Sequence, residues 1–126
     1  MTDLANNAAA AEELSQPMTI GVEAYVSADY ARAERDKLWR KVWQQVGRVE
    51  ELPDVGSYLT YDILDDSIIV VRTGPNESDG FRAHHNVCMR RGRRLVDVPA
   101  GAKNACGRAR KSFVCGFHGW TYGLDG

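Results

Sequence analysis

The chain has 126 residues and a formal net charge of −1, with 44% hydrophobic and 26% charged residues. These values are close to the globular average, so they fit one folded domain with a short tail and exclude a large multidomain enzyme for this chain. The longest strongly apolar run, residues 68–71, is far too short to cross a bilayer. Acidic residues near the N-terminus do not fit a signal peptide, and we therefore expect a cytoplasmic chain.

The N-terminal third of the chain predicts a tail followed by one helix. Residues 1–24 are rich in Ala and Asn, and we expect them to form a flexible tail. The four-residue spacing of apolar side chains predicts a lead-in helix over residues 25–47, with Ser27 as its N-cap and an end near Gly47. Trp39 and Trp43 lie on this apolar stripe, so we expect them to anchor the helix in the core.

After Gly47 the hydrophobic period shortens to that of β-strands. Strands are predicted at residues 58–64, 67–73, 81–87, 113–114 and 120–122, with a tight turn at 65–66 and a mobile loop at 101–110. The predicted fold class is mainly β (α+β): an N-terminal helix that leads into a small antiparallel β-sandwich, whose long loops carry the cysteines.

Three cysteines are too few, and odd in number, for a disulfide framework in a cytoplasmic chain. Cys115 and His118 are separated by two residues on a loop flanked by glycines, so a thiolate and an imidazole can reach one metal centre. Cys88 offers a second thiolate at the end of the strand that begins at Phe81. Two such loops fit either an iron–sulfur cluster or a zinc ion.

The motifs around these residues resemble the Rieske iron–sulfur domain of aromatic-ring-hydroxylating oxygenases, in the large (alpha) subunit. They are His85-Asn86-Val87-Cys88, Arg91-Gly92, Leu95 and Cys115-x-x-His118-Gly119-Trp120-x-Tyr122-x-x-x-Gly126. The lead-in with Trp39, Trp43, Val46-Gly47-Arg48 and Glu51-Leu52-Pro53 is also similar. By this resemblance, residues 48–126 form a Rieske-type domain with two cluster-binding loops that is truncated at its C-terminus.

The resemblance implies an electron-transfer centre. Cys88 and Cys115 would bind one iron of a [2Fe–2S] cluster, and His118 would be one of two imidazoles on the other iron. Arg91 and Trp120 would support the loops. A ferredoxin or a reductase would donate electrons, and a mononuclear Fe(II) in a catalytic domain absent from this chain would receive them to hydroxylate an aromatic ring. No catalytic residue is therefore expected here, and the full-length form would be a homo-oligomer, as a trimer.

The sequence departs from the family pattern at the second imidazole. The family's first loop reads Cys-x-His-Arg-Gly, whereas this chain has Arg90 in the histidine position. A guanidinium stays protonated and offers only donors, so it cannot bind iron. Water, Cys106, His84 or His85 could replace the ligand, the cluster could be labile, or the site could be abolished. Gly116 and Phe117 replace a frequent Pro-Tyr pair, a change expected to lower the potential.

Two other functions compete with the electron-transfer hypothesis. Cys88, Cys106, Cys115 and His118 could form a structural zinc site, although no Cys-x-x-Cys pair is present. Between Cys88 and Lys111 there are eight basic residues and one acid, a net charge of +7 that could bind nucleic acid. Because this segment lacks interleaved aromatic residues, solvated loops or a docking face for an acidic ferredoxin explain it more simply.

Overall fold

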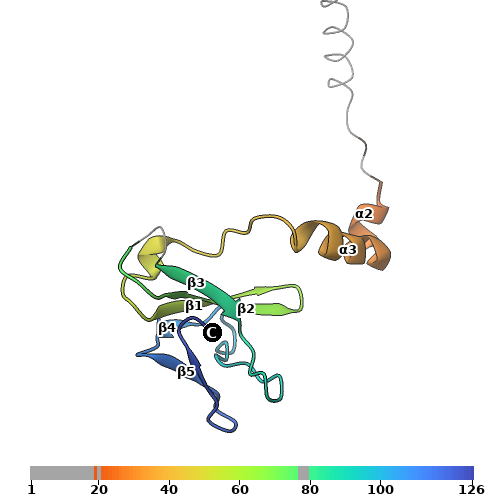
Figure 1. Cartoon of the computed structure of the whole chain (residues 1–126). Coiled ribbons are helices and arrows are strands. Elements are labelled where there is room, and N and C mark those ends of the chain that lie inside the picture. Colours follow the sequence, from red (N-terminus) through yellow and green to blue (C-terminus); the bar gives the residue numbers. More distant parts are fainter. Residues whose placement is uncertain (1–18, 20, 77–79) are drawn as a thin grey trace, which may run out of the picture. The chain divides into compact units, whose positions relative to one another are not determined.

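The computed structural model describes residues 19, 21–76 and 80–126 (Figure 1). It divides the chain into two compact units, residues 1–42 and residues 43–126, which are described separately below. Most of the predicted tail lies outside the described residues. Its last two positions, Glu23 and Ala24, already belong to a helix.

The first unit consists of short helices. α2 (Glu23–Val26) and α3 (Ala28–Glu34) are followed by a π-helical turn, Arg35–Trp39. The predicted N-cap is confirmed, since the Ser27 hydroxyl accepts a hydrogen bond of 3.3 Å from the Tyr30 amide. Helical structure ends at Trp39, not near Gly47 as predicted. The residues beyond it include the β-branched Val42, whose type has a lower helix propensity, and short helices need packing to persist.

The two lead-in tryptophans do not anchor a core as predicted. The exposed fraction is 102% for Trp43 and 40% for Trp39. The prediction assumed that helical spacing continues to residue 47 and keeps both indoles on one buried face. Because the chain leaves the helix before Trp43, that spacing does not apply to it.

The second unit contains two antiparallel sheets. The first has four strands in the order β3-β2-β1-β4, and the second pairs β5 with β6. The strands are β1 (Ser57–Ile63), β2 (Asp66–Arg72), β3 (Phe81–His85), β4 (Cys106–Arg108), β5 (Ser112–Val114) and β6 (Thr121–Gly123). The predicted mainly antiparallel fold is confirmed. The first hairpin turns at Leu64, one residue early, where φ is +56°.

The strand β4 was not predicted, because its residues were assigned to a mobile loop at 101–110. It pairs with the edge of β1, where Leu59 lies opposite Cys106. Thr60 extends the contact: its amide donates to the Ala105 carbonyl, and its hydroxyl accepts from the Ala105 amide, both at 2.8 Å. These partners are 45 residues apart, so no local sequence pattern reveals the pairing.

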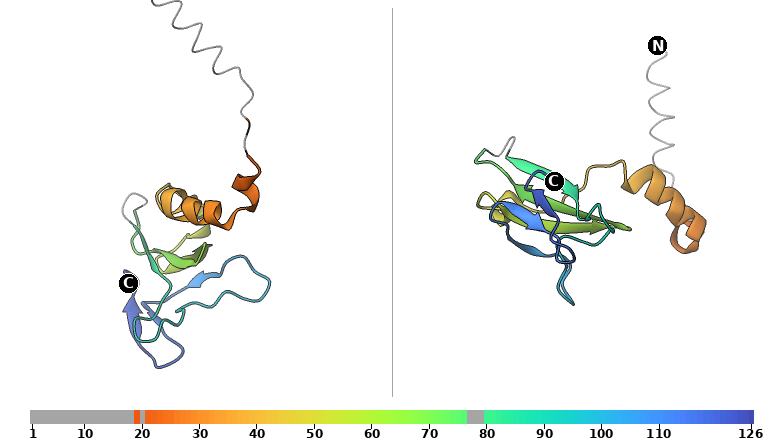
Figure 2. Two further views of the ribbon diagram at one scale, coloured as in Figure 1. Left: turned by 90° about the vertical axis from the view of Figure 1, so that its right-hand side faces the viewer. Right: turned by 60° about the horizontal axis from the view of Figure 1, so that its bottom comes forward.

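The core lies between the two sheets, which are adjacent in both views of Figure 2. Ile69 and Val71 of β2 are fully buried, and Phe113 of β5, 4% exposed, packs against them. The Phe113 ring contacts Tyr58 edge-on, with 5.3 Å between ring centroids. This packing holds the start of the β5–β6 hairpin against β2, and so fixes one end of the loop that carries Cys115.

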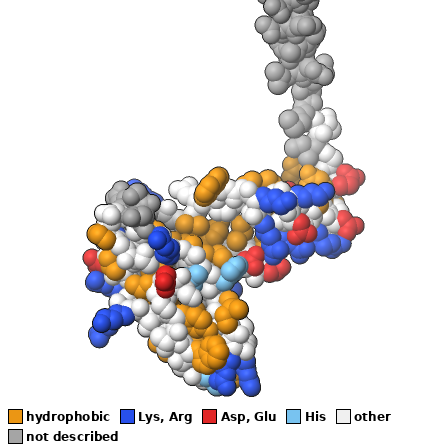
Figure 3. Space-filling view, viewed as in Figure 1, with side chains coloured by type: hydrophobic (Ala, Val, Ile, Leu, Met, Phe, Trp, Pro, Cys, Tyr) orange, Lys and Arg blue, Asp and Glu red, His pale blue; other side chains and the backbone are white. Residues whose placement is uncertain are grey.

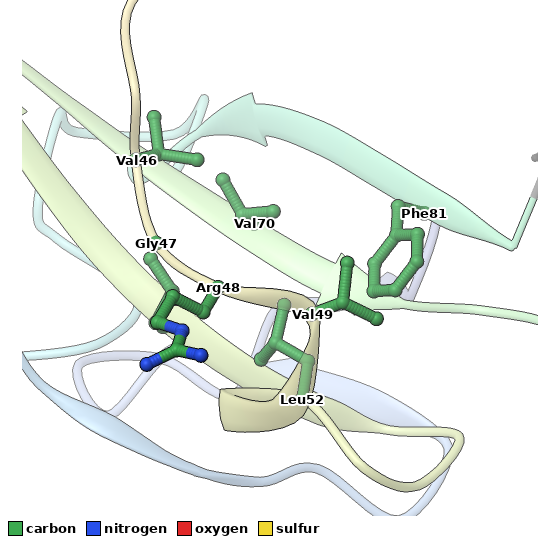
Figure 4. A pocket seen from close by; sticks show the side chains of 8 residues that line it. Val46, Gly47, Arg48, Val49, Leu52, Val70 and Phe81 are labelled. Atoms are coloured by element: carbon green, nitrogen blue, oxygen red, sulfur yellow. The ribbon is translucent and has the colours of Figure 1, made fainter. Parts of the chain in front are cut away.

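The opposite face of the large sheet is covered by the segment before β1. A turn of 3-10 helix, Val49–Glu51, leads to Leu52, which is only 3% exposed. An apolar cavity of about 230 Å³ remains between this segment and the strands (Figure 4). Its lining residues are Val46, Gly47, Arg48, Val49, Leu52, Leu59, Val70 and Phe81. The segment therefore belongs to the folded domain rather than to a helix.

Candidate metal centre

Two loops with the same backbone hydrogen-bonding pattern follow β3 and β5. In the first loop, residues 88–93, the Cys88 amide donates to the Arg93 carbonyl at 2.7 Å. In the second, residues 115–120, the Cys115 amide donates to the Trp120 carbonyl at 2.8 Å. Each bond joins a cysteine to the residue five positions later. The two cysteines are thus held by equivalent turns, although only one turn carries a histidine.

A glycine closes each turn four residues after its cysteine. The amides of Gly92 and Gly119 donate to the carbonyls of Cys88 and Cys115 at 2.8 and 2.9 Å. Their φ angles are +70° and +74°, in the left-handed region that side chains disfavour. The Cys-x-x-x-Gly spacing of both motifs is therefore a requirement of the backbone.

The two thiols are buried next to each other. Cys88 is 3% exposed and Cys115 is 2% exposed, and the neighbouring Cys115 side chain lowers the pKa of Cys88. The Tyr122 hydroxyl donates to the Cys88 sulfur at 3.3 Å and accepts a bond of 2.9 Å from the Met89 amide. The backbone amides of Arg90 and Arg91 also lower the pKa of the Cys88 thiol. Several donors thus surround one buried sulfur.

These donors favour the charged form of the sulfur. The Tyr122 hydroxyl, followed by the Arg90 amide, lowers the pKa of Cys88 below its ordinary value of 9.0, although burial acts in the opposite direction. The hydrogen bond to Cys88 raises the pKa of Tyr122 above 10.0. Because the thiolate is the form that binds metal, the Cys88–Cys115 pair suits an anionic sulfur centre.

The imidazole side of the site is less complete. His118 is exposed, and its ring lies 3.9 Å from the Phe117 ring, at a tilt of 48°. The Arg91 guanidinium, on the first loop, lies 6.0 Å from the centroid of the Phe117 ring on the second loop. Across residues 19, 21–76 and 80–126, no group of three or more His, Cys, Asp or Glu side chains is placed to hold a metal ion. The structure therefore brings the two thiols together but leaves His118 apart from them.

The proposed substitute ligands also lie apart from the thiols. His84 packs edge-on against Phe113 at 5.6 Å, and its Nε2 is buried without a hydrogen-bond partner in the described part of the chain. His85 is exposed on β3. Cys106 is exposed on β4, where it pairs with Leu59 and not with the other cysteines. Nothing supports the four-residue zinc site.

The two residues expected to support the loops, Arg91 and Trp120, act mainly through their backbone groups. The Arg91 amide helps to lower the pKa of Cys88, and the Trp120 carbonyl accepts from the Cys115 amide, while the Trp120 indole is 49% exposed. Sequence reasoning missed the support from Asn86, which is 2% exposed and joins β2 to the residues after the first loop. The His-Asn pair before Cys88 was a signal that could have pointed to it.

The basic segment is partly neutralised by nearby carboxylates. Among the described residues, three ion pairs connect it to acids: Arg93–Asp97 at 2.6 Å, Arg94–Asp62 at 2.9 Å and Arg108–Asp54 at 3.2 Å. Hydrophobic and basic side chains remain visible together at the lower tip of the molecule in Figure 3. Met89 and Phe117, 77% and 56% exposed, belong to the two loops.

An antiparallel domain with two equivalent turns, each carrying a buried cysteine, has the framework of an iron–sulfur protein. The Rieske [2Fe-2S] domain family matches residues 42–126, and the chain belongs to this family. No helix in the described ranges is long and apolar enough to cross a membrane.

Proteins with curated functions share this domain. The glycine betaine monooxygenase oxygenase subunit of Chromohalobacter salexigens is 41% identical over 93 residues, which cover 74% of this chain and 19% of that protein. The chloroplastic choline monooxygenase of Beta vulgaris is 35% identical over 103 residues, covering 81% of this chain and 20% of the relative. The chain thus spans about a fifth of the length of these two relatives.

Solved structures confirm the Rieske-type fold. The quaternary ammonium Rieske monooxygenase CntA, in complex with L-carnitine, superimposes with a TM-score of 0.72 at 28% identity, over 86% of this chain and 28% of that chain. Naphthalene 1,2-dioxygenase from Rhodococcus sp. gives a TM-score of 0.71 at 25% identity, over 91% of this chain and 24% of the other. The similar proteins are therefore oxygenases with different kinds of substrate.

The residues of this chain fit a [2Fe–2S] cluster only in part. Cys88 and Cys115 provide two adjacent buried thiols with hydrogen-bond donors around one sulfur, as an anionic cluster requires. His118 supplies one imidazole by its residue type. Arg90 supplies no ligand, so the donor set is one short of the two-cysteine, two-histidine set.

Proposed function

We propose that this chain is the Rieske iron–sulfur part of a non-haem iron oxygenase, which passes electrons from a ferredoxin or reductase toward a mononuclear iron outside the chain. The observation that supports this most is the pair of buried thiols on two equivalent turns, in a domain of the Rieske family. The proposed ligands are Cys88, Cys115 and His118. We assign no catalytic residue to the chain.

The mixed ligand set suits electron transfer. Neutral imidazoles in place of thiolates reduce the negative charge on a cluster and raise its potential to between about −150 and +300 mV. In this chain the donors to Cys88 act in the same direction, because they stabilise negative charge on the sulfur. The imidazole missing at position 90 should lower the affinity of the site for the cluster.

The substrate class is proposed from the relatives alone. We propose a methylated ammonium compound rather than an aromatic ring. The curated choline and glycine betaine monooxygenases are 35% and 41% identical to this chain, whereas the naphthalene 1,2-dioxygenase structures are 25% to 33% identical. The aromatic substrate predicted from the sequence is not confirmed.

Partners and location are proposed on the same basis. We propose a ferredoxin or reductase as the electron donor, a homo-oligomer and specifically a trimer as the assembly, and a cytoplasmic location. One relative is chloroplastic, so the location differs within the family. The exposed Met89 and Phe117, next to the basic residues of the first loop, provide a face on which an acidic donor could dock.

The function is tested by anaerobic iron–sulfide reconstitution of the 126-residue chain carrying Arg90→His, which restores the family ligand set. We expect two irons and two labile sulfides per chain and a Rieske-type electron paramagnetic resonance signal after reduction. Cys88→Ser or Cys115→Ser in this background should abolish the signal. Cys106→Ser, which changes an exposed cysteine on β4, is the matched control and should leave the signal unchanged. Retention of zinc that depends on Cys106 would contradict the proposal.

A further inference from the structure

The residues around the two buried thiols do not complete a metal site. In the described ranges, no group of three or more His, Cys, Asp or Glu side chains is placed to hold a metal ion. Arg90 offers no lone pair, and His118 is exposed on its turn. In the metal-free chain, Cys88 and Cys115 therefore keep the ordinary chemistry of a thiol pair.

We infer that Cys88 and Cys115 form a reversible disulfide in the metal-free chain, with a small-molecule disulfide such as glutathione disulfide as the oxidant. The pair is then a redox-active dithiol, which is a modification site and not a metal site. Because the inference concerns the metal-free chain, it does not rest on the proposed electron-transfer function.

Strand geometry places both sulfurs on the same face of the β5–β6 hairpin. Phe113 lies opposite Tyr122 in the hairpin register. The Cys115 amide continues this ladder by donating to the Trp120 carbonyl at 2.8 Å. Because side chains alternate along a strand, Cys115 lies on the same face as Phe113 and Tyr122. The Tyr122 hydroxyl donates to the Cys88 sulfur at 3.3 Å, so Cys88 lies against that face too.

Burial and electrostatics agree with a close pair. Both thiols are at most 3% exposed. Like the Tyr122 hydroxyl, the neighbouring Cys115 side chain lowers the pKa of Cys88. The third cysteine, Cys106, is exposed on β4, where it lies opposite Leu59. Cys88 and Cys115 are therefore the two cysteines that the fold offers to each other.

The turns that carry the thiols lie at the surface. Their other residues, 89–93 and 116–120, are all exposed. A Cβ atom built on Gly92, Gly116 or Gly119 would meet no atom within 4 Å outside its chain neighbours, so both turns have room to shift. Exposed loops open locally at a much lower free energy than the whole domain unfolds. A small disulfide can therefore reach a sulfur when its turn opens.

The reaction consists of two thiol–disulfide exchanges. The Cys88 sulfur attacks one sulfur of glutathione disulfide, which breaks that S–S bond, forms a mixed disulfide and releases one glutathione. The Cys115 sulfur then attacks the Cys88 sulfur of the mixed disulfide and releases the second glutathione. Each protein thiol gives its proton to the glutathione thiolate that leaves. Two protein thiols are thus oxidised, one glutathione disulfide is reduced, and excess reduced glutathione reverses both steps.

The experiment uses the 126-residue chain, freed of metal with a chelator and incubated with glutathione disulfide at neutral pH. Intact mass, and the number of free thiols after unfolding, are measured for the wild type and Cys106→Ser. Cys88→Ser and Cys115→Ser are measured in the Cys106→Ser background. Cys106→Ser is the matched control, because it removes the exposed cysteine and leaves the pair. His118→Ala tests whether a residual metal takes part.

We expect Cys106→Ser to lose two hydrogens, to carry no glutathione and to show no free thiol. The wild type should differ only by one glutathione on Cys106. The internal disulfide should exceed forms with glutathione on Cys88 or Cys115 by about tenfold or more, because the second thiol attacks without a bimolecular encounter. The single-cysteine variants should form no internal disulfide, and His118→Ala should behave as the wild type. The urea midpoint should rise on oxidation.

Several results would overturn the inference. One is that both thiols of native Cys106→Ser stay free while Cys106 of the wild type takes up glutathione. Another is two glutathiones on Cys106→Ser, because the two sulfurs then do not meet. A disulfide that excess reduced glutathione leaves intact would contradict its reversibility. Cluster binding by Arg90→His is measured separately, so the proposed function stands or falls on its own result.

Discussion

The Asn86 side chain binds the backbone of Val96 in both directions. Its Oδ1 accepts from the Val96 amide at 2.9 Å, and its Nδ2 donates to the Val96 carbonyl at 2.8 Å. The same amide group also reaches the Leu95 amide and the Ser67 hydroxyl. One buried side chain, two residues before Cys88, therefore ties both ends of the first loop to β2.

Replacing Asn86 should destabilise the domain. Asn86→Ala leaves the Leu95 and Val96 amides without their acceptor, and each buried unsatisfied group costs about 1–3 kcal/mol. We expect the free energy of unfolding in urea to fall by about 2–4 kcal/mol. Ser67→Ala removes one of the four Asn86 bonds, together with the exposed bond from Ser67 to Asp62, and should cost about 1 kcal/mol. Equal losses for the two variants would contradict this role of Asn86.

The two turn glycines should be sensitive for a purely conformational reason. A Cβ on Gly92 or Gly119 meets open space, yet both residues have a positive φ. Alanine at either position should lower the free energy of unfolding by about 1–2 kcal/mol. Gly116→Ala is the matched control, since its surroundings are equally open and its φ is not positive. It should change stability by less than about 0.5 kcal/mol, and a loss equal to that of Gly119→Ala would refute the explanation.

The Tyr122–Cys88 bond predicts a pH dependence of the metal-free chain. The folded pKa of Cys88 is below 9.0, so its stabilisation is fully present above pH 9.0 and is lost as the pH falls through the folded value. The pKa of Tyr122 is above 10.0, so its stabilisation is fully present below pH 10.0 and is lost as the pH rises through the folded value. The contribution is therefore greatest between these two values.

Thermal unfolding of the wild type and Tyr122→Phe tests this prediction. The difference in melting temperature should be larger near about pH 9.5 than near about pH 6. The thiolate absorbance of Cys88 should also titrate at a higher pH in Tyr122→Phe, because its main stabilising donor is gone. A difference in melting temperature that is the same at both pH values would show that the hydroxyl does not act on the thiolate.

The edge strand β4 depends on Thr60. Thr60→Val keeps the shape of this fully buried side chain but leaves the Ala105 amide without its acceptor at 2.8 Å. We expect a loss of about 1–3 kcal/mol in the free energy of unfolding, measured in urea. Thr60→Ser retains the hydroxyl and should recover part of that loss. Faster hydrogen exchange at Ala105 in Thr60→Val would locate the effect at β4.

The sequence predicted those parts of the fold that local patterns encode. A run of consecutive β-branched residues identified β2, and the hydroxyl of Ser27 identified the start of α3. Local patterns did not reveal β4, because its partner Thr60 is distant along the chain. They also misplaced Trp43, because helical spacing describes a buried face only where a helix persists.

The candidate site was likewise predicted only where local sequence patterns encode it. The cysteine spacing indicated two thiols at one centre, and in the structure both are buried and Cys115 lowers the pKa of Cys88. The two turns are equivalent because of the backbone hydrogen bonds from Cys88 to Arg93 and from Cys115 to Trp120. These bonds cannot be predicted from the residue types. The hydrogen bonds of the Asn86 side chain could not be predicted either, since its partners lie both before and after the loop in sequence.

The central claim is that two cysteines and one histidine of this chain hold a Rieske-type centre whose second imidazole is missing at Arg90. Pulsed electron paramagnetic resonance of the reduced chain, frozen directly after reconstitution in imidazole-free buffer, counts the histidine nitrogens bound to the cluster. The account predicts one nitrogen ligand in the wild type and two in Arg90→His. Two nitrogen ligands in the wild type, or none in Arg90→His, would contradict it.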